Sequence, residues 1–242
     1  MVMSGSGEHI VFVHGRPGDE SWLTGGTIAR LHDLGSPSLV LYEADAGAPD
    51  GFAAPEVSGV TAALGALGAT EWRTLPPVSA PDRACADALA DAVAEQWATA
   101  VAIGTVSDAL RLTATAAAHA AGLPVFLCRR MSEAATQRPV AIDVSDHLEQ
   151  KLRALACFPG RWTVADRAVT VTGGPTTPVS GAEAYARLDP PRPPPVAPAP
   201  PPLMNRVLAG VLGVGAGVAF GVLGTLAHQS TASVGEVSIP VG

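Results

Sequence analysis

The apolar and polar positions of the chain form blocks that predict strands followed by helices. Continuous apolar runs, typical of strands buried on both faces, lie at 10–13, 38–42, 100–103 and 123–128. Segments with apolar residues three or four positions apart, which predict helices, lie at 28–34, 55–67, 83–97, 110–121 and 148–156. Ser107 and Ser145 are placed to cap the last two helices. Strands that alternate with helices predict an α/β domain with a doubly wound, mainly parallel sheet.

The first strand leads into the segment with the most candidate chemistry. Ile10–Val13 is followed by a polar loop that carries Asp19 and Glu20, and then by the pair Gly25-Gly26 at the start of a helix. In open α/β sheets, ligands gather at the carboxyl ends of strands. We therefore expect a functional loop at this place.

Three stretches carry a family resemblance. They are Gly15-Arg16-Pro17-Gly18-Asp19-Glu20 with Gly25-Gly26-Thr27-Ile28, then Val106–Ala109, and then Asp143-Val144-Ser145-Asp146 with Lys151, Ala154 and Leu155. They resemble motifs of the PIG-L/LmbE family of zinc-dependent N-acetylglucosaminyl deacetylases, and most of all the actinobacterial deacetylases of mycothiol synthesis. The likeness spans roughly residues 10–188 and implies a Rossmann-like, LmbE-type fold for a domain at 1–189.

The resemblance also implies a metal site that has lost most of its chemistry. The zinc-binding histidines of the family fall on Arg16 and Ala109, and its general-base aspartate falls on Gly18. Arginine has no acceptor for a metal ion, and glycine cannot take a proton from water. Asp19, the other zinc-ligand position, is retained, and it is a metal ligand only if a site survives.

Some of the other motif positions keep the family's residue and others do not. Glu20 and Asp108 are retained, whereas the His and Gln of the last motif fall on Phe158 and Arg161. We therefore expect no intact catalytic set and no cofactor. The resemblance leaves Arg16, Asp19, Gly25, Gly26 and Asp108 as candidate ligand-binding residues.

Several of these residues allow two interpretations. Arg16 either pairs with Asp19 and Glu20 in place of the metal or favours an anionic ligand. The glycines at the helix start either present amides to a ligand oxygen or allow close packing of the helix on the sheet. His14 either ends its strand with a hydrogen-bonded ring or serves as a substitute metal ligand.

These patterns support three functional hypotheses. The first is a membrane-anchored, catalytically inactive homologue of the deacetylases that acts as a binding or scaffold module. The alternative is a divergent zinc-dependent amino-sugar deacetylase with a rebuilt site, in which Asp19, His14 and Asp108 would bind zinc and Glu20 would be the base. In the third, the membrane segment is the functional part.

Composition excludes other classes of function. The net charge of −7, with Lys151 as the only lysine, disfavours a nucleic-acid-binding protein. Three cysteines without CxxC spacing indicate neither a disulfide framework nor a zinc knuckle, and they fit a reducing cytosol.

The composition changes at Pro190. Residues 190–203 are proline-rich and predict an extended linker or, as a second interpretation, a ligand for a proline-recognising partner. Residues 204–228 predict a transmembrane helix, because 207–227 carries no charge and is long enough to cross a bilayer. Its Gly213, Gly217 and Gly221 lie on one face, where another helix can pack closely.

The flanking charges predict the orientation of this helix. Arg187, Arg192 and Arg206 precede the span, so the positive-inside rule places the large domain in the cytoplasm, at the bacterial inner membrane. The tail at 229–242 ends within an apolar stretch, which indicates either a short amphiphilic end or truncation before further spans.

Overall fold

The computed structural model describes residues 7–36, 38–44, 53–69, 71–78, 82–129 and 139–189. Its strands are β1 (Ile10–His14), β2 (Ser38–Glu43), β3 (Glu71–Leu75), β4 (Ala100–Ile103), β5 (Val125–Arg129), β6 (Pro139–Asp143), β7 (Trp162–Ala165), β8 (Ala168–Val171), β9 (Thr176–Pro178) and β10 (Ala182–Leu188). Its helices are α1 (Asp19–Leu23), α2 (Gly25–Asp33), α3 (Ala54–Leu67), α4 (Arg83–Glu95), α5 (Asp108–Ala120), the 3₁₀ turn η1 (Ser145–His147) and α6 (Leu148–Ala156).

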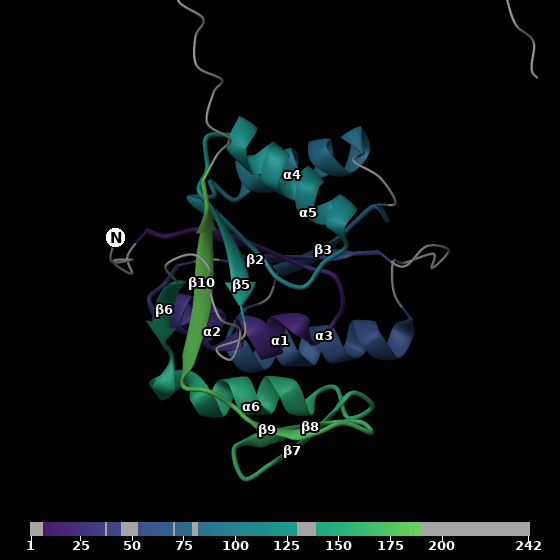
Figure 1. The fold of residues 1–242 in the computed structure, drawn as a ribbon, viewed down its shortest axis with the longest axis vertical. Helices are drawn as coiled ribbons and strands as arrows, with labels where there is room; N and C mark the ends of the chain where they lie inside the picture. Colours follow the sequence, from purple (N-terminus) through teal and green to yellow (C-terminus); the bar gives the residue numbers. More distant parts are fainter. Residues whose placement is uncertain are drawn as a thin grey trace, which may run out of the picture. The chain divides into compact units, whose positions relative to one another are not determined.

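Seven strands form the central sheet, in the order β3-β2-β1-β4-β5-β10-β6 (Figure 1). The strands from β3 to β5 in this order are parallel, and β10 runs antiparallel to both of its neighbours. The prediction of an α/β domain with a mainly parallel sheet is therefore confirmed. The direction of strand progression reverses between β1 and β4, which is where open α/β sheets bind ligands.

Helices cover both faces of this sheet, because the strands alternate their apolar side chains between the two faces. Val11 and Val13 of β1 pack in the core under α4 and α5, together with Leu89 and Leu110. Phe12 belongs to the opposite core, which α2, α3 and α6 cover. Figure 1 shows α4 and α5 on one side of the sheet and the other helices below it.

Most predicted elements are present, and the differences have local causes. Asp19 and Glu20, which we expected in a loop, begin the short helix α1. Ser145 does not cap α6 with its side chain; its hydroxyl hydrogen-bonds to Asp143 Oδ1 at 2.7 Å, and the turn η1 precedes the helix. The small antiparallel sheet β7-β8-β9 was not predicted.

Within the described part of the chain, none of the helices is both long and apolar enough to span a bilayer. The predicted linker at 190–203, transmembrane helix at 204–228 and tail at 229–242 all lie outside the described residues.

Candidate functional site

The motif loop lies at the point where the strand order reverses. It leaves β1 at Gly15, whose amide donates to the carbonyl of Thr105 after β4 at 2.8 Å. It ends at Gly18, which has a left-handed backbone with φ of 93°. An ideal Cβ at Gly18 would lie 3.1 Å from Trp162 Nε1 and 3.3 Å from Arg161 Nη1. An aspartate at this position, as the family resemblance would require, is therefore both strained and crowded.

Asp19 is paired with an arginine, but not with the arginine of its own loop. Arg161 donates from Nη2 to Asp19 Oδ1 and from Nη1 to the carbonyl of Pro17. The guanidinium also lies over the Trp162 ring, 4.8 Å from its centroid. Burial raises the pKa of the Asp19 carboxyl, and Arg161, followed by Arg16, offsets part of this rise. The interpretation that Arg16 forms this salt bridge needs correction, because Arg161 forms it.

Glu20 is fully buried and points away from solvent. Its carboxylate accepts from the amide of Gly18 at 2.7 Å and from the hydroxyl of Ser21 at 2.6 Å. Burial raises its pKa, and these bonds offset part of the rise. Glu20 therefore holds the loop closed, and its side chain is not available to a substrate in this arrangement.

His14 is also fully buried, at the end of β1. Its Nε2 lies 3.1 Å from Thr24 Oγ1, and that hydroxyl donates to the carbonyl of Glu20 at 3.0 Å. Because the Thr24 proton is already used, His14 must donate from Nε2 and keep Nδ1 unprotonated. Among the described residues Nδ1 has no hydrogen-bond partner, and it faces Gly104. Burial lowers the pKa of His14 to about 3.

Asp108 does not join this group. Its side chain is 87% exposed and pairs with Arg111 on α5 at 2.7 Å. Ser107 does cap α5 as predicted, by accepting from the amide of Leu110. His14 thus faces the core, Asp19 faces Arg161, and Asp108 faces solvent. No group of three or more His, Cys, Asp or Glu side chains within the described ranges is placed to hold a metal ion.

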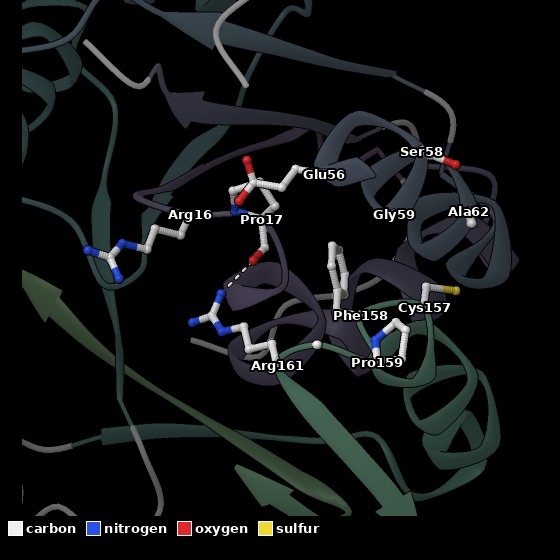
Figure 2. A pocket seen from close by; sticks show the side chains of 11 residues that line it. Arg16, Pro17, Glu56, Ser58, Gly59, Ala62, Cys157, Phe158, Pro159 and Arg161 are labelled. Carbon is white, nitrogen blue, oxygen red and sulfur yellow. Dashed lines mark hydrogen bonds between the residues drawn. The ribbon is translucent and has the colours of Figure 1, made fainter. Parts of the chain in front are cut away.

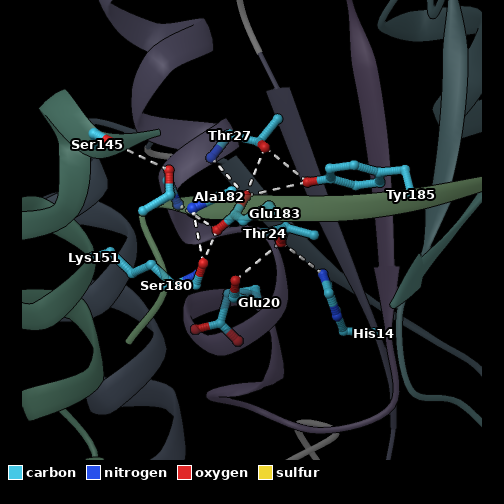
Figure 3. A network of polar contacts seen from close by, with 12 residues as sticks. His14, Glu20, Thr24, Thr27, Ser145, Lys151, Ser180, Ala182, Glu183 and Tyr185 are labelled. Atoms are coloured by element: carbon cyan, nitrogen blue, oxygen red, sulfur yellow. Dashed lines mark hydrogen bonds and ion pairs between the residues drawn. The ribbon is translucent and has the colours of Figure 1, made fainter. Parts of the chain in front are cut away.

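The amides at the start of α2 are occupied by a carboxylate of the protein itself (Figure 3). Glu183 of β10 accepts from the amides of Gly26 and Thr27, each at 2.9 Å, and from the Thr27 hydroxyl at 2.6 Å. The ammonium of Lys151 completes the group at 2.6 Å from Glu183 Oε1. A Cβ at Gly26 would lie 2.5 Å from Val144, so this glycine also permits close packing. The amide of Gly26 is therefore not open to an external ligand.

A pocket of about 800 Å³ opens beside the motif loop (Figure 2). Its lining comes from the motif loop, α3 and the segment after α6: Arg16, Pro17, Glu56, Ser58, Gly59, Ala62, Cys157, Phe158, Pro159, Gly160 and Arg161. Of the predicted site residues, the structure brings only Arg16 to this pocket. The motif resemblance had placed Phe158 and Arg161 at positions where the family has His and Gln. No pattern in the sequence indicated the partners of Arg161 or the role of Glu183.

Comparisons with known proteins define the class of fold. No family model and no curated protein sequence matches the chain. Solved structures do match, with 16% sequence identity in each of three examples. GalB, the 4-carboxy-2-hydroxymuconate hydratase of Pseudomonas putida KT2440, has a TM-score of 0.55 over 78% of this chain and 100% of its own.

Two deacetylases are similar to a lesser degree. A deacetylase of teicoplanin biosynthesis has a TM-score of 0.50 over 62% of this chain and 83% of its own. The N,N'-diacetylchitobiose deacetylase of Pyrococcus horikoshii has a TM-score of 0.50 over 63% and 70%. The chain thus has the α/β fold of the PIG-L/LmbE-type deacetylases, which confirms the predicted resemblance at the level of the fold.

Proposed function

We propose that this chain is a non-hydrolytic relative of the LmbE-type deacetylases that acts as a membrane-attached binding module. The observation that carries the proposal is the guanidinium of Arg161 on the carboxylate of Asp19. The carboxylate of Asp19, which would face the metal in the motif, is thereby paired with a cation of the protein itself. One of the similar structures is a hydratase, so the fold by itself does not fix deacetylation as the reaction.

The fold implies a zinc ion, and the described residues do not fit one. Zinc hydrolysis needs three protein ligands, an open fourth position and a base for the bound water. Here Asp19 is neutralised by Arg161, and the lone pair of His14 faces Gly104 inside the core. The base position is Gly18, and Glu20 is turned inward. We therefore derive no step through zinc.

The expected result is that the 242-residue chain, purified in detergent, binds no stoichiometric zinc and does not hydrolyse N-acetylglucosaminyl substrates. Metal content after dialysis and release of acetate are the measurements. Arg161→Gln serves as a matched variant, because it frees the Asp19 carboxylate without supplying further ligands, and it should also remain without stoichiometric zinc. Zinc-dependent turnover that disappears in Asp19→Ala would refute the proposal.

We propose further that residues 204–228 anchor this module in the inner membrane, with the described domain in the cytoplasm. The uncharged stretch at 207–227 and the preceding arginines support this orientation. The full chain should remain in the membrane fraction after an alkaline wash. Val214→Arg combined with Val218→Arg should release it, because each arginine lies near the centre of the stretch and costs about 2.5–3.5 kcal/mol there.

A matched control for the membrane test is Leu112→Arg, which adds the same charge at an exposed position of the described domain. Recovery of the unaltered chain in the soluble fraction would contradict the anchor. In intact spheroplasts, external protease should leave the domain uncut, and cleavage there would contradict the cytoplasmic orientation.

A further inference from the structure

Two arginines line the pocket beside the motif loop, and of these only Arg16 lacks an ion-pair partner among the described residues. Arg161 is already paired with Asp19, and two of its donors are used by Asp19 and Pro17. Arg16, in contrast, is exposed; its charge helps to lower the pKa of Asp19, but it forms no ion pair or side-chain hydrogen bond with the residues that the structure describes. Its guanidinium therefore keeps its donors for a ligand. Arginine binds carboxylate and phosphate groups through two parallel hydrogen bonds.

The rest of the pocket is suited to an apolar group. Figure 2 shows Phe158 and Pro159 across the pocket from the Arg161 guanidinium, while the Arg16 side chain extends further outward, away from Phe158. Gly59 of α3 makes room for the Phe158 ring, since a Cβ there would lie 2.9 Å from Phe158 Cε1. The volume of about 800 Å³ lies within the range of small-molecule sites.

One acid also lines the pocket, and it limits the ligand charge. Glu56 lies in the first turn of α3, where its carboxylate accepts from the amide of Ala53 at 3.3 Å. The α3 N-terminus partly compensates this negative charge. A ligand with one negatively charged group can bind Arg16 without approaching Glu56. A cationic ligand would be repelled by the guanidinium groups of Arg16 and Arg161.

We propose that this pocket binds an organic anion with a single oxyanion group, which binds Arg16, and an apolar body, which packs against Phe158. This inference rests on the proposed function, because it assumes that no metal occupies the motif loop. The proposed ligand is negatively charged, whereas a zinc site would hold a cation. The recognised chemistry is the oxyanion head, whether carboxylate or phosphate monoester.

The test uses benzoate, phenyl phosphate and the neutral benzamide with the full chain, measured by ligand-observed NMR titration. We expect benzoate to bind and Arg16→Gln to weaken it about tenfold, as expected for the loss of a charged hydrogen bond. Arg16→Lys should recover part of the affinity. Glu56→Gln should tighten benzoate binding, because it removes a like charge. Benzamide should be unaffected by either charge change.

Two comparisons complete the design. Arg153→Gln removes an exposed arginine that does not line the pocket, and it should leave benzoate binding unchanged. A preference for benzoate or for phenyl phosphate identifies the oxyanion, and either preference supports the proposal. Equal binding of benzamide and benzoate, or no effect of Arg16→Gln, overturns it. Either result leaves the proposed function untouched, because that function is tested separately by zinc content and acetate release.

Discussion

Replacing Glu183 with glutamine is expected to lower the free energy of unfolding by about 4 kcal/mol, as is typical when one partner of a buried ion pair is removed. The side chains of Lys151 and Glu183 are 4% and 2% exposed. Among the described residues, the Lys151 ammonium has Glu183 as its only hydrogen-bond acceptor. Glutamine would leave that ammonium buried without a counter-charge, and its amide group would face the amides of α2.

Replacing the other partner, Lys151, is expected to lower the free energy of unfolding by a smaller amount. Lys151→Met leaves the carboxylate of Glu183 with the amides of Gly26 and Thr27 and with the Thr27 hydroxyl. Tyr185 donates to Thr27 Oγ1 at 2.8 Å, which leaves the Thr27 proton directed at Glu183. We therefore expect a loss of about 2 kcal/mol for Lys151→Met.

Urea unfolding of both variants and of the double variant measures these costs. The double variant should be more stable than the sum of the single losses predicts, because it leaves no buried charge unpaired. Arg153→Gln, on an exposed position of the same helix, is the control and should change stability little. Equal costs for the two single variants would contradict the assignment of α2 amides to Glu183.

Replacing His14 with glutamine is expected to remove a pH dependence of stability worth about 4 kcal/mol between pH 7 and pH 3. His14 has a pKa of about 3 in the folded protein, whereas an unfolded histidine takes up a proton near its ordinary value of about 6.5. The unfolded state therefore binds more protons in this window, and the contribution of His14 to stability falls as the pH falls.

Two neighbouring carboxyls act with the opposite sign and must be separated from His14. Burial raises the pKa of both Asp19 and Glu20, so the folded state binds their protons more readily and their contribution grows as the pH falls. The difference between the original chain and His14→Gln cancels these two contributions, provided the substitution leaves the Asp19 and Glu20 environments unchanged. Glutamine also keeps an N–H donor for Thr24.

Urea unfolding of both proteins at several pH values tests the prediction. The stability of the original chain relative to His14→Gln should decrease by about 1.4 kcal/mol per pH unit within the window. His119→Gln, a histidine on α5 far along the chain, is the control and should not remove this slope. A difference that does not change with pH would show that folding does not lower the pKa of His14.

The local hydrophobic pattern was sufficient to predict the strands and helices with a continuous or regularly spaced set of buried residues. β1, β2 and β4 are continuous apolar runs buried on both faces, and α2, α5 and α6 have apolar stripes with the helical period. Two of the strands that were not predicted, β3 and β9, carry weaker patterns. β3 is an edge strand with Glu71 and Arg73 on its exposed side, and β9 is three exposed residues. Such strands are formed by their neighbours more than by their own composition.

Little of the candidate site could be predicted from the sequence. The motif resemblance places Arg16 and Ala109 where the deacetylases have histidines and Gly18 where they have an acid, and this comparison needs only the residue types. The pairing of Arg161 with Asp19 is not visible in the sequence, because the two residues are 142 residues apart. The same holds for Glu183, which lies 157 residues from the amide of Gly26.

The sequence by itself determined the α/β layering, the place of the motif loop at the end of β1 and the absence of the family's histidines from it. Periodicity and residue chemistry are local properties, so they can be obtained without coordinates. The tertiary structure decided which charges form ion pairs, namely Arg161 with Asp19 and Lys151 with Glu183. It also placed Arg16 at the open pocket. These pairings depend on how the segment from α6 to β10 packs against α1 and α2, and no local pattern encodes that packing.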